Sequence, residues 1–357
     1  MKKTSKLIWT NIVVLFICLW SVNFFFAVII DGVYLYRKTF VPIGQNLYRE
    51  SLPDQESALR IFRELRQLTK RYVPYMGWTR TSFSGATTTV DPIDGERVTP
   101  QTTDHPTKHV HFFGGSTMWG TGVDDHHTIP AQFNTLHPEY RVFNHAQSGF
   151  VSRQELARLV NLVNQNSQMD VIVFYDGCND PLTLCRGDIS INGHREESKI
   201  IRKLTHQWEV PKGLYKATQR AIRTVFKDGS RPPSRCHDNP SYAKTVATTI
   251  VNNWKIAKNV AELGGAEFHA ILQPVARLGQ PSVAYLDEKF DAKEWQLVYP
   301  FIRKIKETEG LTWIHDFTDA FDRKDYIYID LCHVNNLGNQ IIANKLNEVL
   351  MRSIPSS

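Results

Sequence analysis

The most apolar part of the chain is a run near the N-terminus, from Leu7 to Ile30. At a rise of about 1.5 Å per residue, a helix of this length crosses a hydrocarbon core of roughly 30 Å. A cleaved signal peptide, the alternative, would have a shorter apolar region ending in small residues, whereas this run continues through the bulky Phe24–Phe26. The pattern therefore predicts a transmembrane anchor at residues 7–30.

The charges on either side of this run favour one orientation. Three lysines precede it, and two basic residues, Arg37 and Lys38, follow soon after. Because basic residues concentrate on the cytoplasmic side of a membrane, we expect residues 1–6 to form a cytoplasmic tail. The body of the chain would then be extracytoplasmic, that is periplasmic or extracellular. Nucleic acid is an improbable partner for an exported body.

From residue 108 to residue 352, short apolar runs alternate with longer stretches of helical periodicity. This alternation is typical of an α/β domain with a central parallel sheet. A last helix is expected after Asn336, because apolar residues recur there at helical spacing. The strands are expected at 110–113, 140–146, 170–176, 267–275 and 313–317, and further helices at 152–165 and 242–265.

Composition and charge indicate the size of the domain and distinguish residues 186–240 and 31–107 from the rest of the chain. The chain has 357 residues, 42% of them hydrophobic, which is enough for one large domain or two small ones. The net charge of +6 is concentrated in residues 186–240, which hold 12 Lys and Arg against 6 Asp and Glu. We interpret this segment as a basic insertion whose apolar residues, such as Trp208 and Phe226, form a satellite core rather than a lid. Residues 31–107 are interpreted as a juxtamembrane region without a core of its own.

Candidate chemistry follows the predicted strands, because sites in open α/β sheets form at the carboxyl ends of strands. Ser116 comes after two glycines behind the first strand, Gly149 follows the second, and Asn179 follows the third. The backbone amides of Ser116 and Gly149 and the side-chain amide of Asn179 are three donors for one substrate oxygen. Such donors stabilise the oxyanion of acyl transfer. The residues therefore indicate a catalytic serine with an oxyanion hole.

A serine nucleophile needs a base, and the base needs a carboxylate that fixes its tautomer. Asp330 and His333, three residues apart before the last helix, fit these roles. Each of these motifs alone is more often an ordinary turn or cap. Together, in this order and at these places, they predict a triad of Ser116, His333 and Asp330.

At these four positions the sequence resembles the SGNH (GDSL-type) hydrolases, whose blocks centre on Ser, Gly, Asn and His. The resemblance covers residues 108 to 350. The common Gly-Asp-Ser of the first block is Gly114-Gly115-Ser116 here, so an acidic residue before the nucleophile is missing. The resemblance implies a flavodoxin-like three-layer α/β/α fold, hydrolysis or transfer of acyl esters, and no cofactor or metal.

Membrane-tethered proteins of this kind often serve polysaccharide or envelope pathways, so the resemblance implies a glycan O-acetyl group as substrate. Three alternatives stay open. They are an acyltransferase to a glycan hydroxyl, a lipid esterase of the lysophospholipase type, and a non-catalytic glycan-binding or assembly protein. The natural partner is thus an acylated glycan or lipid, with the membrane held through the N-terminal helix.

Four cysteines lie outside the apolar run, an even number that suits an oxidising compartment. Three pairings are possible. The catalytic interpretation brings Cys178, beside Asn179, close to Cys332, beside His333, and so suggests one bridge. Cys185 and Cys236 would then tie off the basic insertion, with free buried thiols as the alternative. The histidines form no chelating set with acidic or cysteine partners, so no metal is expected.

Overall fold

The computed structural model describes residues 2–40, 50–205, 234–286 and 293–352. The chain divides into two compact units, residues 1–42 with 198–232, and residues 43–197 with 233–357. The first unit contains helix α1 (Lys2–Phe40). Within α1, Ser5–Val33 is long and apolar enough to cross a membrane, and it includes the predicted span at 7–30.

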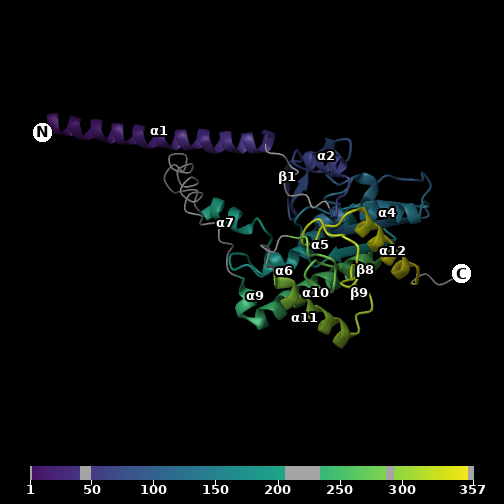
Figure 1. Cartoon of the computed structure of the whole chain (residues 1–357). Helices are drawn as coiled ribbons and strands as arrows, with labels where there is room; N and C mark the ends of the chain where they lie inside the picture. Colours follow the sequence, from purple (N-terminus) through teal and green to yellow (C-terminus); the bar gives the residue numbers. More distant parts are fainter. Residues whose placement is uncertain (1, 41–49, 206–233, 287–292, 353–357) are drawn as a thin grey trace. The chain divides into compact units, whose positions relative to one another are not determined.

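The second unit is built on a parallel sheet of five strands (Figure 1). Its strand order is β6-β5-β7-β8-β9, in which the first strand of the sheet lies between the second and the third. This is the flavodoxin-like order of a doubly wound sheet. The strands are β5 (Lys108–Gly114), β6 (Tyr140–Asn144), β7 (Val171–Asp176), β8 (Glu267–Leu272) and β9 (Ile314–Asp316).

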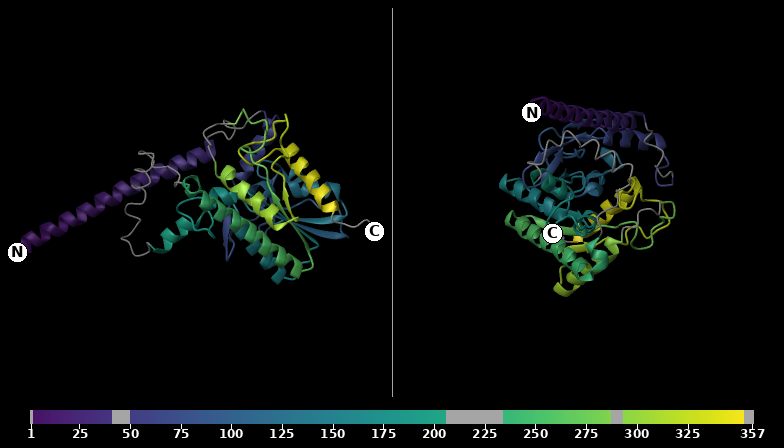
Figure 2. Two further views of the ribbon diagram at one scale, coloured as in Figure 1. Left: turned by 90° about the horizontal axis from the view of Figure 1, so that it is seen from below. Right: turned by 90° about the vertical axis from the view of Figure 1, so that its left-hand side faces the viewer.

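Helices cover both faces of the sheet, so the unit has three layers (Figure 2). One face packs against α5 (Ser152–Asn164), α10 (Pro240–Leu263) and α11 (Glu294–Glu309). The other packs against α3 (Ser116–Trp119), α4 (Ile129–Leu136) and α12 (Asn336–Arg352). Neighbouring residues of one strand, such as Val173 and Phe174, enter opposite cores. The predicted α/β/α fold class is confirmed.

The first part of the second unit departs from the expected organisation. Residues 31–107 were expected to be a juxtamembrane region, but residues 50–107 belong to the same compact unit as the sheet. The indole of Trp78 packs edge-to-face on Phe150 at 5.7 Å, and the fully buried Arg97 pairs with Asp125 at 2.8 Å. A few large side chains thus attach a mostly polar segment to the domain.

The elements of this segment are short. A helix, α2, is followed by two small antiparallel hairpins. Their bounds are α2 (Gln55–Leu65), β1 (Lys70–Val73), β2 (Gly77–Arg80), β3 (Phe83–Ser84) and β4 (Thr89–Val90). Asp54 caps α2 by accepting a hydrogen bond from the backbone N–H of Ser57 at 3.1 Å. The second hairpin joins the domain through the buried Val90.

The basic insertion is described only at its two ends. Short helices lie at these ends, α7 (Glu197–Thr205) and α9 (Arg235–Asp238), and α6 (Asn179–Leu184) precedes the insertion. Trp208 and Phe226, expected in a satellite core, fall outside the described residues.

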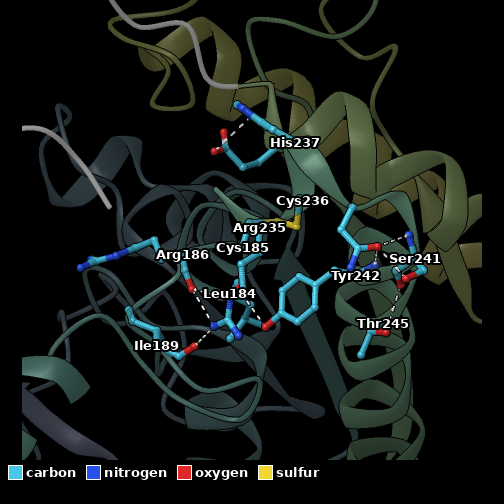
Figure 3. The surroundings of a disulfide bond; sticks show 12 residues. Leu184, Cys185, Arg186, Ile189, Arg235, Cys236, His237, Ser241, Tyr242 and Thr245 are labelled. Carbon is cyan, nitrogen blue, oxygen red and sulfur yellow. Dashed lines mark hydrogen bonds and ion pairs between the residues drawn. A yellow bond between two sulfur atoms is a disulfide. The ribbon is translucent and has the colours of Figure 1, made fainter. Parts of the chain in front are cut away.

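A disulfide joins Cys185 to Cys236 and closes the base of the insertion (Figure 3). Both sulfurs are buried, and Arg235 reinforces the closure by donating a hydrogen bond to the Arg186 carbonyl at 2.7 Å. The same guanidinium lies over the ring of Tyr242 at 4.6 Å. The suggested bridge between Cys185 and Cys236 is therefore present.

The other suggested bridge is absent, because Cys178 and Cys332 are free cysteines. The two residues nevertheless lie close together, as expected, because their thiols are hydrogen-bonded to each other. This hydrogen bond, and burial after it, raise the pKa of the Cys332 thiol well above its usual range. The Cys332 thiol is therefore held in its protonated form.

We predict that removing the disulfide lowers stability strongly. A bridge that spans 51 residues of sequence is worth about 4 kcal/mol by loop-closure entropy. Cys185→Ser with Cys236→Ser should lower the melting temperature of the full-length chain, whereas Cys18→Ser should not. Recovery of Cys185 and Cys236 as alkylated thiols from unreduced protein, with an unchanged melting temperature in the double variant, would contradict the prediction.

Candidate active site

The turn after β5 presents Ser116 at the start of α3. Gly115 has to be a glycine here, because a Cβ atom on it would lie 2.2 Å from the Asn179 side-chain nitrogen. The missing side chain lets the amide of Asn179 approach the turn that carries the serine. Ser116 is the first residue of α3, so its N–H has no acceptor within the helix. The local sequence thus places a hydroxyl and a free amide together.

The side chains of Ser116, His333 and Asp330 form one hydrogen-bonded chain. His333 Nε2 lies 2.7 Å from Ser116 Oγ, and His333 Nδ1 lies 2.6 Å from Asp330 Oδ2. The other carboxylate oxygen of Asp330 accepts hydrogen bonds from the backbone N–H groups of Cys332 and His333, at 2.9 and 2.8 Å. Because Nδ1 faces a carboxylate, its proton belongs there, which leaves Nε2 to accept the serine proton. The sequence-predicted triad residues therefore meet in the arrangement that a serine nucleophile needs.

The charge of Asp330 dominates the acid–base behaviour of the imidazole. Burial opposes protonation of His333, but the adjacent carboxylate and its hydrogen bond outweigh this and raise the pKa of His333 to about 9. For Asp330 itself, burial acts to raise the pKa, but the imidazolium and the hydrogen bonds prevail and lower it. The pair is thus stabilised as carboxylate and imidazolium, the charge distribution that follows proton transfer from serine.

Two further candidate donors converge on the serine turn. Gly149 follows β6 with a φ of 83°, a conformation that favours glycine, and its N–H has no hydrogen-bond acceptor among the described residues. Its neighbour Phe150 has its carbonyl 3.6 Å from where a Cβ of Gly115 would be. The Asn179 side-chain amide lies at the same glycine. The residues predicted for the oxyanion hole are therefore gathered around Ser116.

Buried polar contacts fix the loops that carry these donors. Asp180 accepts hydrogen bonds from the backbone N–H of Ser152 at 3.1 Å and from its hydroxyl at 2.6 Å, which joins the loop after β7 to the start of α5. The indole N–H of Trp295 donates to the Cys178 carbonyl at 3.0 Å. Burial raises the pKa of Asp180 to about 8. The loop is thus anchored one residue before and one residue after Asn179.

One residue of this region was missed by sequence reasoning. Gln273 comes directly after β8 and is buried, and its side-chain oxygen accepts a hydrogen bond from the Thr117 hydroxyl at 2.9 Å. Its side-chain nitrogen is buried and has no partner among the described residues. The signal was available, because Gln273 stands at the carboxyl end of a strand, as Asn179 does.

A possible set of metal ligands coincides with the triad. One ligand atom each from Asp330, Cys332 and His333 lies within 4.8 Å of the others. Both ring nitrogens of His333 are already engaged, one by Asp330 and one by Ser116. The donor set therefore fits a hydrogen-bonded triad better than a metal site, and the expectation of no metal and no cofactor stays a prediction.

Among solved structures, the chain is similar to a lipolytic protein of the G-D-S-L family from Veillonella parvula, at 14% identity and a TM-score of 0.40 over 68% of this chain and 98% of that one. It is also similar to a carbohydrate acetylesterase family member from Sinorhizobium meliloti, at 14% identity and a TM-score of 0.37 over 69% and 98%. It is also similar to a psychrotrophic esterase from Pseudoalteromonas, at 11% identity and a TM-score of 0.38 over 69% of this chain and 97% of that one.

No family model matches the sequence. No curated protein matches it either. At these identities the chemistry has to be read from this chain's own residues.

We predict an alkaline pH profile for ester hydrolysis. The base form of His333 is neutral, so a pKa of about 9 means that kcat/KM rises with pH above 6.5 and levels off only above about pH 9. Asp330→Asn removes the charge that raises this pKa. It should move the midpoint to lower pH and reduce the plateau by about 10³- to 10⁴-fold.

The control is Asp170→Asn. Asp170 directly precedes β7, so it lies at the amino ends of the strands, opposite the site at their carboxyl ends. It should leave the midpoint and the plateau unchanged. The same midpoint near pH 6.5 in the wild type and in Asp330→Asn would contradict the prediction.

Proposed function

We propose that the chain is a serine ester hydrolase that forms an acyl-enzyme on Ser116. The observation that carries the proposal is the 2.7 Å contact between Ser116 Oγ and His333 Nε2, with Asp330 on the far side of the ring. An ordinary turn does not require an imidazole beside a serine hydroxyl, and it does not require a carboxylate beside an imidazole. The three groups together serve nucleophilic catalysis.

In the proposed mechanism, Ser116 Oγ attacks the ester carbonyl while His333 Nε2 takes the serine proton. The tetrahedral oxyanion accepts hydrogen bonds from the amides of Ser116 and Gly149 and from Asn179, each contributing on the order of 3 kcal/mol to barrier reduction. His333 then gives its proton to the departing alcohol, and the C–O bond of the ester breaks. A water molecule, deprotonated by His333, hydrolyses the acyl-serine and regenerates the enzyme.

The leading substrate is an O-acetyl group on an extracytoplasmic glycan. The resemblance to membrane-tethered SGNH proteins supports this choice. The disulfide between Cys185 and Cys236 supports an oxidising compartment, since such bonds are rare in the cytosol. Helix α1 supports attachment to a membrane, with residues 1–6 as a cytoplasmic tail and the catalytic unit outside.

We predict that Ser116→Ala abolishes ester hydrolysis. For the full-length chain in detergent, kcat/KM for p-nitrophenyl acetate should fall by at least about 10⁴-fold, because the nucleophile is removed. Ser167→Ala is the matched control, since Ser167 lies in the turn before β7, at the edge of the sheet opposite Ser116.

Equal turnover by the wild type and Ser116→Ala would refute the proposal. In the same assay, activity that appears only when a glycan acceptor is supplied would identify an acyltransferase. A preference for long acyl chains would favour a lipid ester over an acetyl ester.

A further inference from the structure

An arginine lies directly against the candidate oxyanion hole. Arg195 Nη1 is 2.7 Å, and its Cδ 2.8 Å, from the position that a Cβ on Gly149 would occupy. Its side chain therefore rests on the α-carbon of a residue whose N–H is a proposed oxyanion donor. Arg195 is exposed. It has no hydrogen bond or ion pair with another described residue. The Arg195 guanidinium thus lies at the site without a carboxylate partner among the described residues.

A second arginine, Arg80 of β2, approaches the helix that begins with Ser116. The Arg80 guanidinium lies 5.6 Å from the ring centre of Trp119, which is three residues after Ser116. Its Nε is buried and has no hydrogen-bond partner among the described residues. Burial lowers the pKa of Arg80, and no carboxylate acts in the opposite direction. The cation–π contact with Trp119 leaves the buried Nε–H donor of Arg80 without a partner among the described residues.

Strand β2 connects the two arginines to residues 147–150. Trp78 and Arg80 are two residues apart and so point to the same face of the strand. The Trp78 indole donates to the Ser148 carbonyl at 3.4 Å, and the Arg80 backbone N–H donates to the Gln147 side chain at 3.2 Å. The ring of His194, next to Arg195, packs on Trp78 at 5.4 Å. Strand β2 therefore contacts the loop that carries Gly149, and the Arg195 side chain lies on Gly149 itself.

An unpaired and partly buried charge, such as that of Arg80, is costly, and it is retained where something outside the chain pairs with it. Two other arginines of the unit are paired with a carboxylate of the chain itself. Arg97 contacts Asp125 at 2.8 Å, and Arg158 contacts Glu96. Arg80 and Arg195, which flank the site, have no such carboxylate among the described residues. A guanidinium presents a planar fork that matches a carboxylate.

We propose that Arg195 and Arg80 form a subsite for a negatively charged group of the substrate, a carboxylate on the sugar that bears the ester. The substrate class is then an acylated acidic glycan with uronate units. This rests on the proposed function, because the subsite gains its meaning from the adjacent acyl-transfer site. Arg195 binds the carboxylate beside Gly149, and Arg80 adds positive charge from the Trp119 side.

The first test compares the release of acetate from two acetyl esters that differ in the charge of the sugar, using the full-length protein. The substrates are O-acetylated oligogalacturonate and its methyl ester, in which the carboxylates are neutralised. The wild type should hydrolyse the acid form with a kcat/KM about tenfold higher, the usual effect of one charged hydrogen bond. Arg195→Gln should abolish this preference through a higher KM for the acid form. Arg141→Gln, which removes the same charge at the amino-terminal half of β6, should leave the preference intact.

Arg80→Gln should also reduce the preference. An unchanged preference with a lower melting temperature would assign Arg80 to packing against Trp119 and overturn its part in the proposal. The absence of any preference in the wild type, or equal losses on both esters in Arg195→Gln, would overturn the subsite as a whole.

A second measurement does not depend on catalysis. Calorimetry with the Ser116→Ala protein should detect binding of deacetylated oligogalacturonate, about tenfold weaker in Ser116→Ala combined with Arg195→Gln. The same calorimetric measurement is made with glucose 6-phosphate and with a neutral glucan. Tighter binding of the sugar phosphate would overturn the carboxylate assignment, and equal binding of the neutral glucan would overturn the anionic subsite.

The two proposals fail in different ways. Salt-sensitive binding of oligogalacturonate without turnover of any ester would leave the subsite in place and remove the esterase function. Turnover of both esters at equal rates, with no binding of the acidic oligomer, would remove the subsite and leave the esterase function.

Discussion

The site depends on one hydrogen-bonded chain, from Asp330 through His333 to Ser116. Its serine and histidine are 217 residues apart in the sequence, so neither end of the chain can build it locally. The parallel sheet brings them together, because Ser116 stands at the carboxyl end of β5 and His333 lies just before α12, which packs against α4 on the same face of the sheet as α3. Any change that displaces the turn at Asp330 separates the imidazole from the carboxylate, from the serine or from both.

Buried polar groups, rather than apolar packing, set the positions of the loops around that chain. Asp176 accepts a hydrogen bond from the Trp254 indole at 2.7 Å, and Asp180 binds the start of α5. Burial raises the pKa of Asp176 to about 6 and that of Asp180 to about 8, so the protein bears a cost to keep these carboxyls inside. A site built on such contacts is held rigidly, as preorganised catalysis requires.

Much of the sheet and the triad could be predicted from the sequence, because buried strands are continuous apolar runs and reactive groups follow their carboxyl ends. Helix α11 was not predicted, since Pro300 interrupts its pattern. The attachment of residues 50–107 was also missed, because isolated side chains such as Trp78 and Arg97 make it, and a lone residue in a polar stretch gives no periodic signal. The position of Arg195 beside Gly149 is a contact across 46 residues that no local pattern encodes.

The most direct test of the account is covalent capture of the nucleophile. The full-length protein is treated with a fluorophosphonate, which phosphonylates activated serines, and the modified peptide is located by mass spectrometry. The account predicts a single adduct on Ser116 that is lost in His333→Ala. Modification of another serine, or equal labelling of Ser116 in His333→Ala, would contradict it, because the hydroxyl would then not owe its reactivity to the imidazole.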